Sequence, residues 1–255
     1  MSVCAVVPAA GSGSRLGLVT PKLFLSLSLR GQTVWSVLQS KLLAAVDHIC
    51  VVLSPSAIAP FEAQLERPIP SWLSIVVQAY PTGMGDAVFQ ALPVWQYFQT
   101  MVVLWGDQVN IRSETIMRTI ATQNAWRNGC TIPVVRRRQP YVQYDITEEG
   151  FLFRIRQSRE GDKLDAHGLS DVGCFALHTQ ELSPLWKEFV EIHDIGCVTM
   201  ERNFLPFLVF LGTRGWPVRI IPASSAVESR GINTTADLQF AKRYLTRSER
   251  MSSRL

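Results

Sequence analysis

The chain has 255 residues, of which 47% are hydrophobic and 18% are charged, and its formal net charge is +4. This length fits one α/β domain with room for a small lobe, and the low charged fraction excludes a disordered chain. The basic residues gather in short runs at 136–138 and 243–254, not along one face, so we expect no nucleic acid partner.

The five cysteines form no Cys-x-x-Cys pair, and the N-terminal apolar run is too short for a secretory leader. An odd number of unpaired cysteines favours a reducing cytoplasm. No stretch reaches the roughly 20 apolar residues that span a bilayer, so we expect no membrane partner. The sequence does not indicate an oligomeric state.

The first predicted element is a buried parallel strand at residues 3–7 (VCAVV). A loop of small residues follows, whose N–H groups can hold phosphate oxygens. Its candidate nucleotide-binding residues are Ala9, Ala10, Gly11, Ser12, Gly13 and Ser14. Arg15 and Lys22 add cations suited to a triphosphate and to released pyrophosphate. The spacing matches neither the P-loop nor the dinucleotide fingerprint, so an ordinary strand-to-helix turn remains an alternative.

A second loop of this kind is predicted at residues 81–86 (PTGMGD). Between the two loops we expect a helix that Thr33 caps, a strand at 49–53, a helix at 54–65 and a strand at 75–78. The second loop leads into a helix at 87–92. Loops that follow parallel strands gather at the carboxyl edge of the sheet, so two such loops predict a ligand pocket there.

The most apolar strand, 101–105 (MVVLW), ends at Gly106 and Asp107. A carboxylate just beyond a central strand is well placed to bind Mg²⁺, which prefers hard oxygen ligands. Asp107 can equally cap the helix predicted at 113–122. From this segment alone both interpretations remain open.

The second half is predicted to begin with a strand at 131–135 and to continue as an antiparallel hairpin of strands 141–145 and 151–155. Further predicted elements are a loop at 156–168, a strand at 170–177, helices at 183–192 and 200–211, a strand at 217–222, a loop at 229–233 and a helix at 235–245. We therefore expect a single domain over 1–245, in which 136–170 form the hairpin and its loop, and a fraying basic tail at 246–255.

Five motifs resemble, in order, those of the sugar-1-phosphate nucleotidylyltransferases, the pyrophosphorylases. The closest likeness is to the uridylyltransferase domain of bacterial N-acetylglucosamine-1-phosphate uridylyltransferase. The motifs are residues 8–15 with 21–22, Gln78 with 83–87, 105–107, 170–175 and 231–233. The resemblance implies an α/β, GT-A-like (Rossmann-like) fold: a mixed, mostly parallel central sheet flanked by helices, with a small antiparallel excursion.

The resemblance also implies a reaction, in which an acceptor phosphate attacks the α-phosphorus of an NTP and releases pyrophosphate. Arg15 would hold the leaving phosphates, and Lys22 would neutralise the α-phosphate. Asp107 and Asn233 would bind Mg²⁺. The remaining nucleotide contacts implied are Gln78, Gly83, Met84 and Gly106, with Gln78 and Gly83 facing a pyrimidine, for which UTP is favoured.

The acceptor pocket implied by the resemblance contains Tyr141, Gln157, Arg159, Asp171 and Asn203, and here the chain departs most from the family. Asp171 stands where the uridylyltransferase has an asparagine, and an ionised carboxylate cannot donate a hydrogen bond.

Two other functions therefore remain open. One is a CTP-dependent cytidylyltransferase acting on a small phosphate or phosphonate. The other is a non-catalytic nucleotide-binding regulatory domain, which the retention of both cations and both metal ligands disfavours. The hexapeptide-repeat domain of the bifunctional relatives has no counterpart after residue 245, so we expect no acetyltransferase activity.

Overall fold

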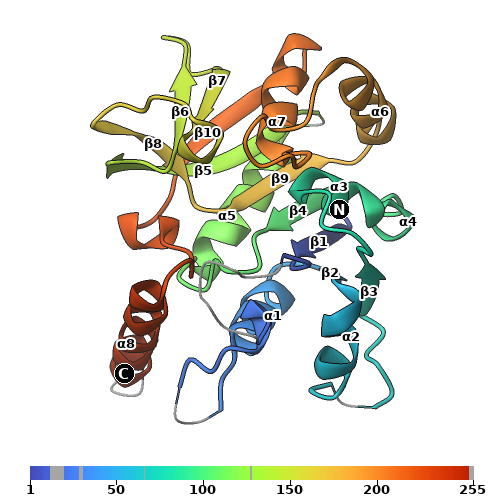
Figure 1. Ribbon diagram of the computed structural model, residues 1–255, viewed down its shortest axis with the longest axis vertical. Coiled ribbons are helices and arrows are strands. Elements are labelled where there is room, and N and C mark those ends of the chain that lie inside the picture. Colours follow the sequence, from blue (N-terminus) through green and yellow to red (C-terminus); the bar gives the residue numbers. More distant parts are fainter. Residues whose placement is uncertain (12–19, 29–30, 66, 127, 253–255) are drawn as a thin grey trace.

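The computed structural model describes residues 1–11, 20–28, 31–65, 67–126 and 128–252 (Figure 1). A ten-stranded sheet crosses the molecule in the order β3-β2-β1-β4-β9-β5-β8-β6-β7, and β10 pairs with β5. The strands are β1 (Val3–Pro8), β2 (His48–Leu53), β3 (Leu73–Val77), β4 (Thr100–Leu104), β5 (Cys130–Arg138), β6 (Val142–Ile146), β7 (Leu152–Gln157), β8 (His167–Asp171), β9 (Cys174–His178) and β10 (Val218–Pro222).

The sheet is mixed, as the sequence motifs predict. Strands β1, β2, β3, β4, β5, β6 and β10 run in one direction, whereas β7, β8 and β9 run in the other. The antiparallel strands β6, β7 and β8 form the predicted excursion, which rises above the body of the sheet (Figure 1). The predicted α/β fold class, with helices flanking a mostly parallel central sheet, is confirmed.

Helices cover both faces of the sheet. They are α1 (Val34–Leu43), α2 (Pro55–Glu62), α3 (Met84–Gln90), α4 (Leu92–Trp95), α5 (Ser113–Asn124), α6 (Leu182–Ile192), α7 (Phe204–Thr213) and α8 (Thr235–Ser252). Alternate residues of β1 point to opposite faces, as a strand requires. Val3, Ala5 and Val7 join the core beneath α1, α2, α5 and α8, whereas Cys4 and Val6 join the core beneath α3, α4, α6 and α7. Two buried cores therefore hold the central strands rigidly.

Two of the predicted elements differ from the observed ones because of the local backbone conformation. The strand predicted at 170–177 is split into β8 and β9, because Gly173 adopts a φ of +71° that turns the chain. The helix predicted at 200–211 begins later, at Phe204, after Met200 adopts a φ of +55°. Pro206 then lies in the first turn, where its missing N–H is not needed.

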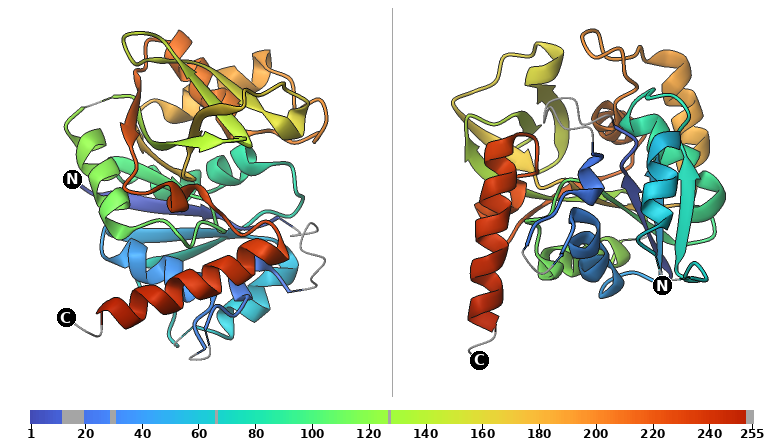
Figure 2. Two further views of the ribbon diagram at one scale, coloured as in Figure 1. Left: turned by 90° about the vertical axis from the view of Figure 1, so that its left-hand side faces the viewer. Right: turned by 60° about the horizontal axis from the view of Figure 1, so that its bottom comes forward.

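The C-terminal boundary also differs from the prediction. Helix α8 runs to Ser252, so the expected start of a basic tail at residue 246 falls inside the helix. Asp237 and Thr234 begin this helix as a capping box: the Thr234 N–H donates to the Asp237 carboxylate at 2.9 Å and the Asp237 N–H to the Thr234 hydroxyl at 3.2 Å. Figure 2 shows α8 extending past the main body.

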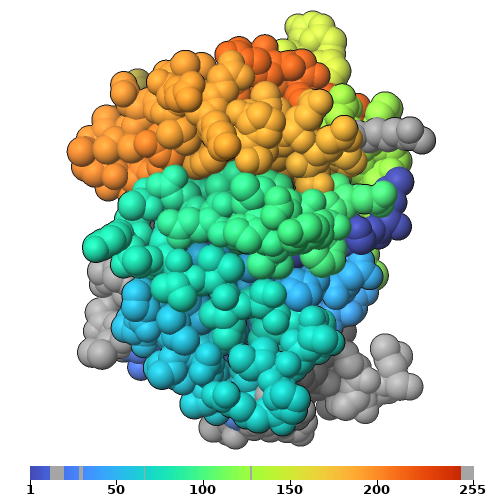
Figure 3. Space-filling model, turned by 90° about the vertical axis from the view of Figure 1, so that its right-hand side faces the viewer, coloured from blue at the N-terminus to red at the C-terminus, as the bar shows by residue number. Residues whose placement is uncertain are grey.

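Helices α3 and α4 pack closely against α6 and α7. In Figure 3 the orange region, which contains α6 and α7, lies directly against the teal and green region of α3 and α4. Stacking of Phe89 on Trp186 at 4.2 Å joins α3 to α6.

All five cysteines are free thiols. Within the described ranges, no helix has the length and apolar character needed to cross a bilayer.

Candidate active site

A cavity of about 710 Å³ opens at the carboxyl ends of β1 and β4. This is the edge at which open α/β sheets bind ligands, and the volume suits a ligand of nucleotide size. Its walls contain residues from all five sequence motifs: Ala9, Gly83, Gly106, Asp171 and Asn233 are among them. The structure therefore brings the predicted motifs together around one cavity.

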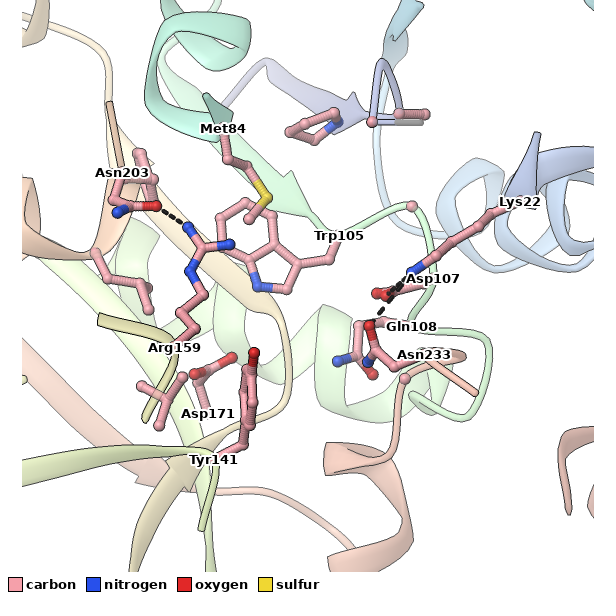
Figure 4. A pocket seen from close by; sticks show the side chains of 18 of the residues that line it. Lys22, Met84, Trp105, Asp107, Gln108, Tyr141, Arg159, Asp171, Asn203 and Asn233 are labelled. Carbon is pink, nitrogen blue, oxygen red and sulfur yellow. Dashed lines mark hydrogen bonds and ion pairs between the residues drawn. The ribbon is translucent and has the colours of Figure 1, made fainter. Parts of the chain in front are cut away.

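Lys22, Asp107 and Asn233 converge on one side of this cavity (Figure 4). The Lys22 ammonium donates to Asp107 Oδ2 at 3.0 Å and to Asn233 Oδ1 at 3.3 Å. The three residues come from the turn Lys22–Phe24, from the loop after β4 and from the start of α8. Two hard oxygen atoms thus face one positive charge.

The loop that carries Asp107 is held from both sides. The Lys41 ammonium, on α1, donates to the carbonyl oxygens of Val109 and Ile111. The Ile232 N–H donates to the backbone oxygen of Asp107 at 3.0 Å and ties this loop to the segment bearing Asn233. Burial lowers the pKa of Lys41 to about 8, although the nearby Glu228 and Glu114 carboxylates oppose the shift.

The oxygen atoms of Asp107 and Asn233 fit a divalent cation. Among the described residues, no group of three or more His, Cys, Asp or Glu side chains forms a larger metal cluster. Mg²⁺ commonly takes one or two protein oxygens and completes its shell with water and substrate phosphate. The position of the Lys22 ammonium marks where a positive charge is favourable, so a carboxylate and an amide suffice for the predicted Mg²⁺ site.

Part of the predicted nucleotide wall lies outside the described residues. Ala9, Ala10 and Gly11 line the cavity, and the Ala9 N–H donates to Val52 O at 2.8 Å. Ser12, Gly13, Ser14 and Arg15 fall within 12–19, which the structure does not describe. Gly106 lets the segment after β4 approach the end of β1, since a Cβ there would lie 3.1 Å from Pro8 O. The roles assigned to Ser12, Gly13, Ser14 and Arg15 stay predictions.

The predicted base-binding residues form a rigid turn. Gln78 is 4% exposed, and its Nε2 donates to Gly83 O at 3.0 Å. Gly83 has a φ of +124°, and a Cβ there would lie 2.5 Å from the backbone nitrogen of Arg202. The amide of Gln78 thus positions the Gly83 loop, and Gly83 allows this loop to contact the segment before α7. Both residues and Met84 line the cavity.

All five predicted acceptor residues line the cavity, and Figure 4 shows Tyr141, Arg159, Asp171 and Asn203 across from Lys22. Arg159 donates to Asn203 Oδ1, and it lies 3.3 Å from Glu201 Oε2. Glu160 accepts from Thr199 Oγ1 at 2.6 Å and from Asn203 Nδ2 at 2.9 Å. Burial alone would raise the pKa of Glu160, but these donors hold it below its usual value. The acceptor wall is therefore a fixed network of donors and acceptors.

Asp171 is the carboxylate of this wall that departs from the family pattern. Burial raises the pKa of Asp171 above its usual value, and the Gly173 N–H, which donates to Oδ1 at 2.7 Å, opposes only part of that shift. The Tyr144 hydroxyl also lowers this pKa, and the charge of Asp107 raises it. Asp171 thus presents a carboxyl group at the cavity wall whose ionisation burial disfavours.

Sequence reasoning missed several residues of the site. Gln108 and Glu201 line the cavity, and Lys41 and Glu160 position its loops. Arg137, in the basic run on β5, also lines the cavity. Gln108 directly follows Asp107, and Arg137 lies in a run of three arginines, so both carried a local signal; Lys41 and Glu160 act only through long-range contacts and carried none.

Comparisons with known proteins agree with this geometry. Residues 5–172 match the MobA-like NTP transferase domain family. The bifunctional protein GlmU of Desulfitobacterium hafniense (strain Y51) is 25% identical over 241 residues, which cover 93% of this chain and 51% of that protein. GlmU of Thermotoga petrophila is 30% identical over 245 residues, 94% of this chain and 51% of that protein. The chain thus spans about half the length of these relatives.

Solved structures share the fold at low sequence identity. A putative glucose-1-phosphate thymidylyltransferase from Bacillus anthracis, in complex with a sucrose, has a TM-score of 0.75 and 15% identity, and the match covers 95% of each chain. The 4-diphosphocytidyl-2C-methyl-D-erythritol synthase of Anaerococcus prevotii DSM 20548 has a TM-score of 0.65 and 14% identity, with 96% of each chain covered. With two thirds of its length matched by the family, this chain belongs to the MobA-like NTP transferase domain family, a family of nucleotidyltransferases.

Proposed function

We propose that this protein joins a pyrimidine NTP, with UTP favoured, to a sugar-1-phosphate and releases pyrophosphate, in a reaction that requires Mg²⁺. The observation that carries this proposal is the convergence of Lys22, Asp107 and Asn233 at the wall of the cavity that the base-binding turn and the acceptor residues also line. A cation and two hard oxygens that can hold Mg²⁺ would there neutralise the negative charge that develops when phosphate attacks phosphate.

The chemistry needs positioning and charge neutralisation rather than a protein nucleophile. Asp107 and Asn233 would hold Mg²⁺, which would neutralise phosphate charge. Lys22, displaced from these two oxygens, would then donate to the α-phosphate and to the attacking phosphate. Ala9, Ala10 and Gly11 would contact the nucleotide from the opposite wall. Arg15 would stabilise the leaving pyrophosphate.

The acceptor wall supports a polyhydroxylated acceptor. Asp171 and Glu201 supply oxygens that accept from hydroxyl groups, whereas Arg159, Asn203 and Gln157 supply donors. Tyr141 lies beside them as an aromatic surface. Vicinal hydroxyls, each able to donate and accept, match such an alternating wall. Sugar phosphates are therefore the acceptor class that we propose.

One observation keeps a CTP-dependent reaction on a small phosphate or phosphonate as the second candidate. The Gln78 amide, with Nε2 donating to Gly83 O, leaves Oε1 to accept. Both uracil N3–H and the cytosine amino group can donate to such an oxygen, so Gln78 does not select UTP over CTP. Asp171, in place of the family asparagine, alters the acceptor wall in a way that a non-sugar acceptor would tolerate.

We also propose a cytoplasmic site of action, for which the five free thiols are the support. The acceptor and the NTP would then be the small-molecule partners of the protein, with no nucleic acid partner.

The decisive experiment is a screen for Mg²⁺-dependent pyrophosphate release with each common NTP against sugar-1-phosphates and small phosphonates. We expect turnover with a pyrimidine NTP that stops when EDTA removes the metal. Intact NTP binding without turnover for any pair would contradict the enzymatic function and favour a regulatory nucleotide-binding domain. Release with CTP and a phosphonate alone would establish the second candidate.

A further inference from the structure

Arg137 differs from Lys22, Arg159 and Arg230, the other described cations that line the cavity, because each of those three has a carboxylate partner. Lys22 lies 3.0 Å from Asp107, Arg159 lies 3.3 Å from Glu201 and Arg230 lies 2.8 Å from Asp237. Among the ion pairs of the described residues, none involves Arg137. A half-buried guanidinium without a carboxylate is unfavourable until an anion joins it.

The guanidinium of Arg137 is fixed in a way that suits such an anion. Its Nη1 donates to the carbonyl oxygen of Ser229 at 3.0 Å. The opposite edge of the same group, Nε and Nη2, is the edge that binds a carboxylate or phosphate through two parallel hydrogen bonds. Both Arg137 and Ser229 line the cavity, so this bond holds the guanidinium at the cavity wall and leaves Nε and Nη2 to donate to an anion.

The backbone of Arg137 lies on β5, next to β8, the strand that carries Asp171 of the acceptor wall. On β5, Val134 pairs with Asp171 and Arg137 pairs with Gly168. Three residues of strand correspond to about 10 Å between the backbone positions of Val134 and Arg137, and the alternation of a strand points the side chains of these two positions to opposite faces of the sheet. Arg137 and Asp171 line the same cavity, together with Tyr141.

We propose that Arg137 binds an anionic oxygen group of the acceptor that is separate from the phosphate to be nucleotidylated. This inference rests on the proposed function and narrows its acceptor to phosphorylated molecules with a second negative charge, either a carboxylate or a second phosphate. Arg137 is then the residue that selects such acceptors over their neutral counterparts.

Matched acceptors test this selection. D-glucose 1-phosphate and D-glucuronate 1-phosphate differ by a hydroxymethyl group and a carboxylate, and 2-hydroxyethylphosphonate and phosphonoacetate form the same pair without a sugar. We expect the charged member of a pair to have a kcat/KM about 10-fold to 100-fold higher, as one charge-assisted contact gives. D-glucose 1,6-bisphosphate separates a second phosphate from a carboxylate as the preferred group.

The variant Arg137→Gln should remove this preference and leave the KM of the NTP unchanged, whereas Arg137→Lys should retain part of it. The matched control is Arg136→Gln, because Arg136 is the exposed neighbour on β5 and lies outside the cavity wall. A preference that survives in Arg137→Gln would overturn the inference. An equal loss of kcat with every acceptor would also overturn it, because Arg137 would then act on the transferred phosphate.

Calorimetric binding decides the inference independently of turnover. With Mg²⁺ and a non-hydrolysable NTP present, the wild-type protein should bind D-glucuronate 1-phosphate more tightly than D-glucose 1-phosphate, and Arg137→Gln should bind them equally. Equal affinities in the wild type, or no binding of either, would contradict the anionic subsite. Absence of turnover alongside selective binding would contradict only the proposed function.

Discussion

The ammonium of Lys41 lies 2.7 Å from the carbonyl oxygen of Ile111 and joins α1 to the loop that follows β4. The same ammonium donates to Val109 O, two residues beyond Asp107. Asp107 therefore owes its position to a lysine on a helix that does not itself line the cavity. Because the ammonium is partly buried and bonded to two carbonyl oxygens, the lysine acts as a fixed support.

The substitution Lys41→Met should lower both the unfolding free energy of the protein and the affinity of the proposed Mg²⁺ site. It leaves two buried carbonyl oxygens without a donor, which costs about 1–3 kcal/mol of unfolding free energy. The Mg²⁺ concentration for half-maximal turnover should rise several-fold, since the loop bearing Asp107 loosens. Urea denaturation and a Mg²⁺ titration measure the two effects. Lys41→Arg, which restores donors, should recover part of the metal response; a variant with normal Mg²⁺ dependence would show that Lys41 has no positioning role.

The lowered pKa of Lys41 gives this contact a pH signature. In the folded protein the pKa is about 8, against 10.5 for a free lysine, so the unfolded chain binds the extra proton between these values. Stability contributed at this position is therefore smallest below pH 8 and rises with pH through that window. The unfolding free energy of the wild type minus that of Lys41→Met should increase from pH 8 to pH 10. A difference that stays constant or falls would contradict the burial of this ammonium.

Replacement of Asp107 separates a ligand from a structural cap. Asp107→Ala should lower turnover by about 100-fold or more, as removal of a key electrostatic group does. The unfolding free energy should change by less than about 1 kcal/mol, because the partly exposed ion pair with Lys22 contributes little and the Ile232 bond uses only the backbone oxygen of Asp107. The exposed Asp194→Ala is the control. Unfolding of Asp107→Ala would identify the residue as a cap.

Gly83 should be irreplaceable for a steric reason. Gly83→Ala puts a Cβ 2.5 Å from the Arg202 backbone at a φ of +124°, and should cost about 1–3 kcal/mol. Because the Arg202 segment leads to Asn203, the KM values of both the NTP and the acceptor should rise. Gly150→Ala, at a φ of +85° with nothing within 4 Å, is the matched control for the backbone term alone. Equal effects of the two substitutions would show that the contact with Arg202 does not contribute to the cost of the Gly83 substitution.

The sequence predicted the central strands of the fold from local patterns, and it predicted the donor side of the site through the resemblance to a family. The proximity of Lys22, Asp107 and Asn233 agrees with roles that only the family resemblance implied. Strands β1, β2 and β4 are short apolar runs, so their presence followed from local patterns. The break between β8 and β9 did not, because it depends on the positive φ of Gly173, which an apolar run conceals.

The acceptor wall was the part that the sequence could not define. Glu160 supports Asn203 across 43 residues, and Lys41 reaches Ile111 across 70 residues, so neither contact has a local pattern. The turn at Met200 delays α7 to Phe204 and leaves Glu201 beside Arg159. Such contacts arise only when distant segments pack, which is why the acceptor residues were predicted as a set but not as a network.

Asp171 should be a destabilising residue at neutral pH. Its pKa is raised by burial, so the folded state binds a proton more readily than the unfolded chain does, and stability falls as the pH rises through the folded pKa. Asp171→Asn removes that cost and keeps an oxygen to accept from the Gly173 N–H. The variant should therefore have a higher urea midpoint than the wild type at pH 7. The gap should narrow on acidification toward about pH 4, where about half of the free carboxyl is protonated as well. A lower midpoint for the variant at pH 7, or a gap that is unchanged at pH 4, would show that the ionised carboxylate of Asp171 stabilises the acceptor wall.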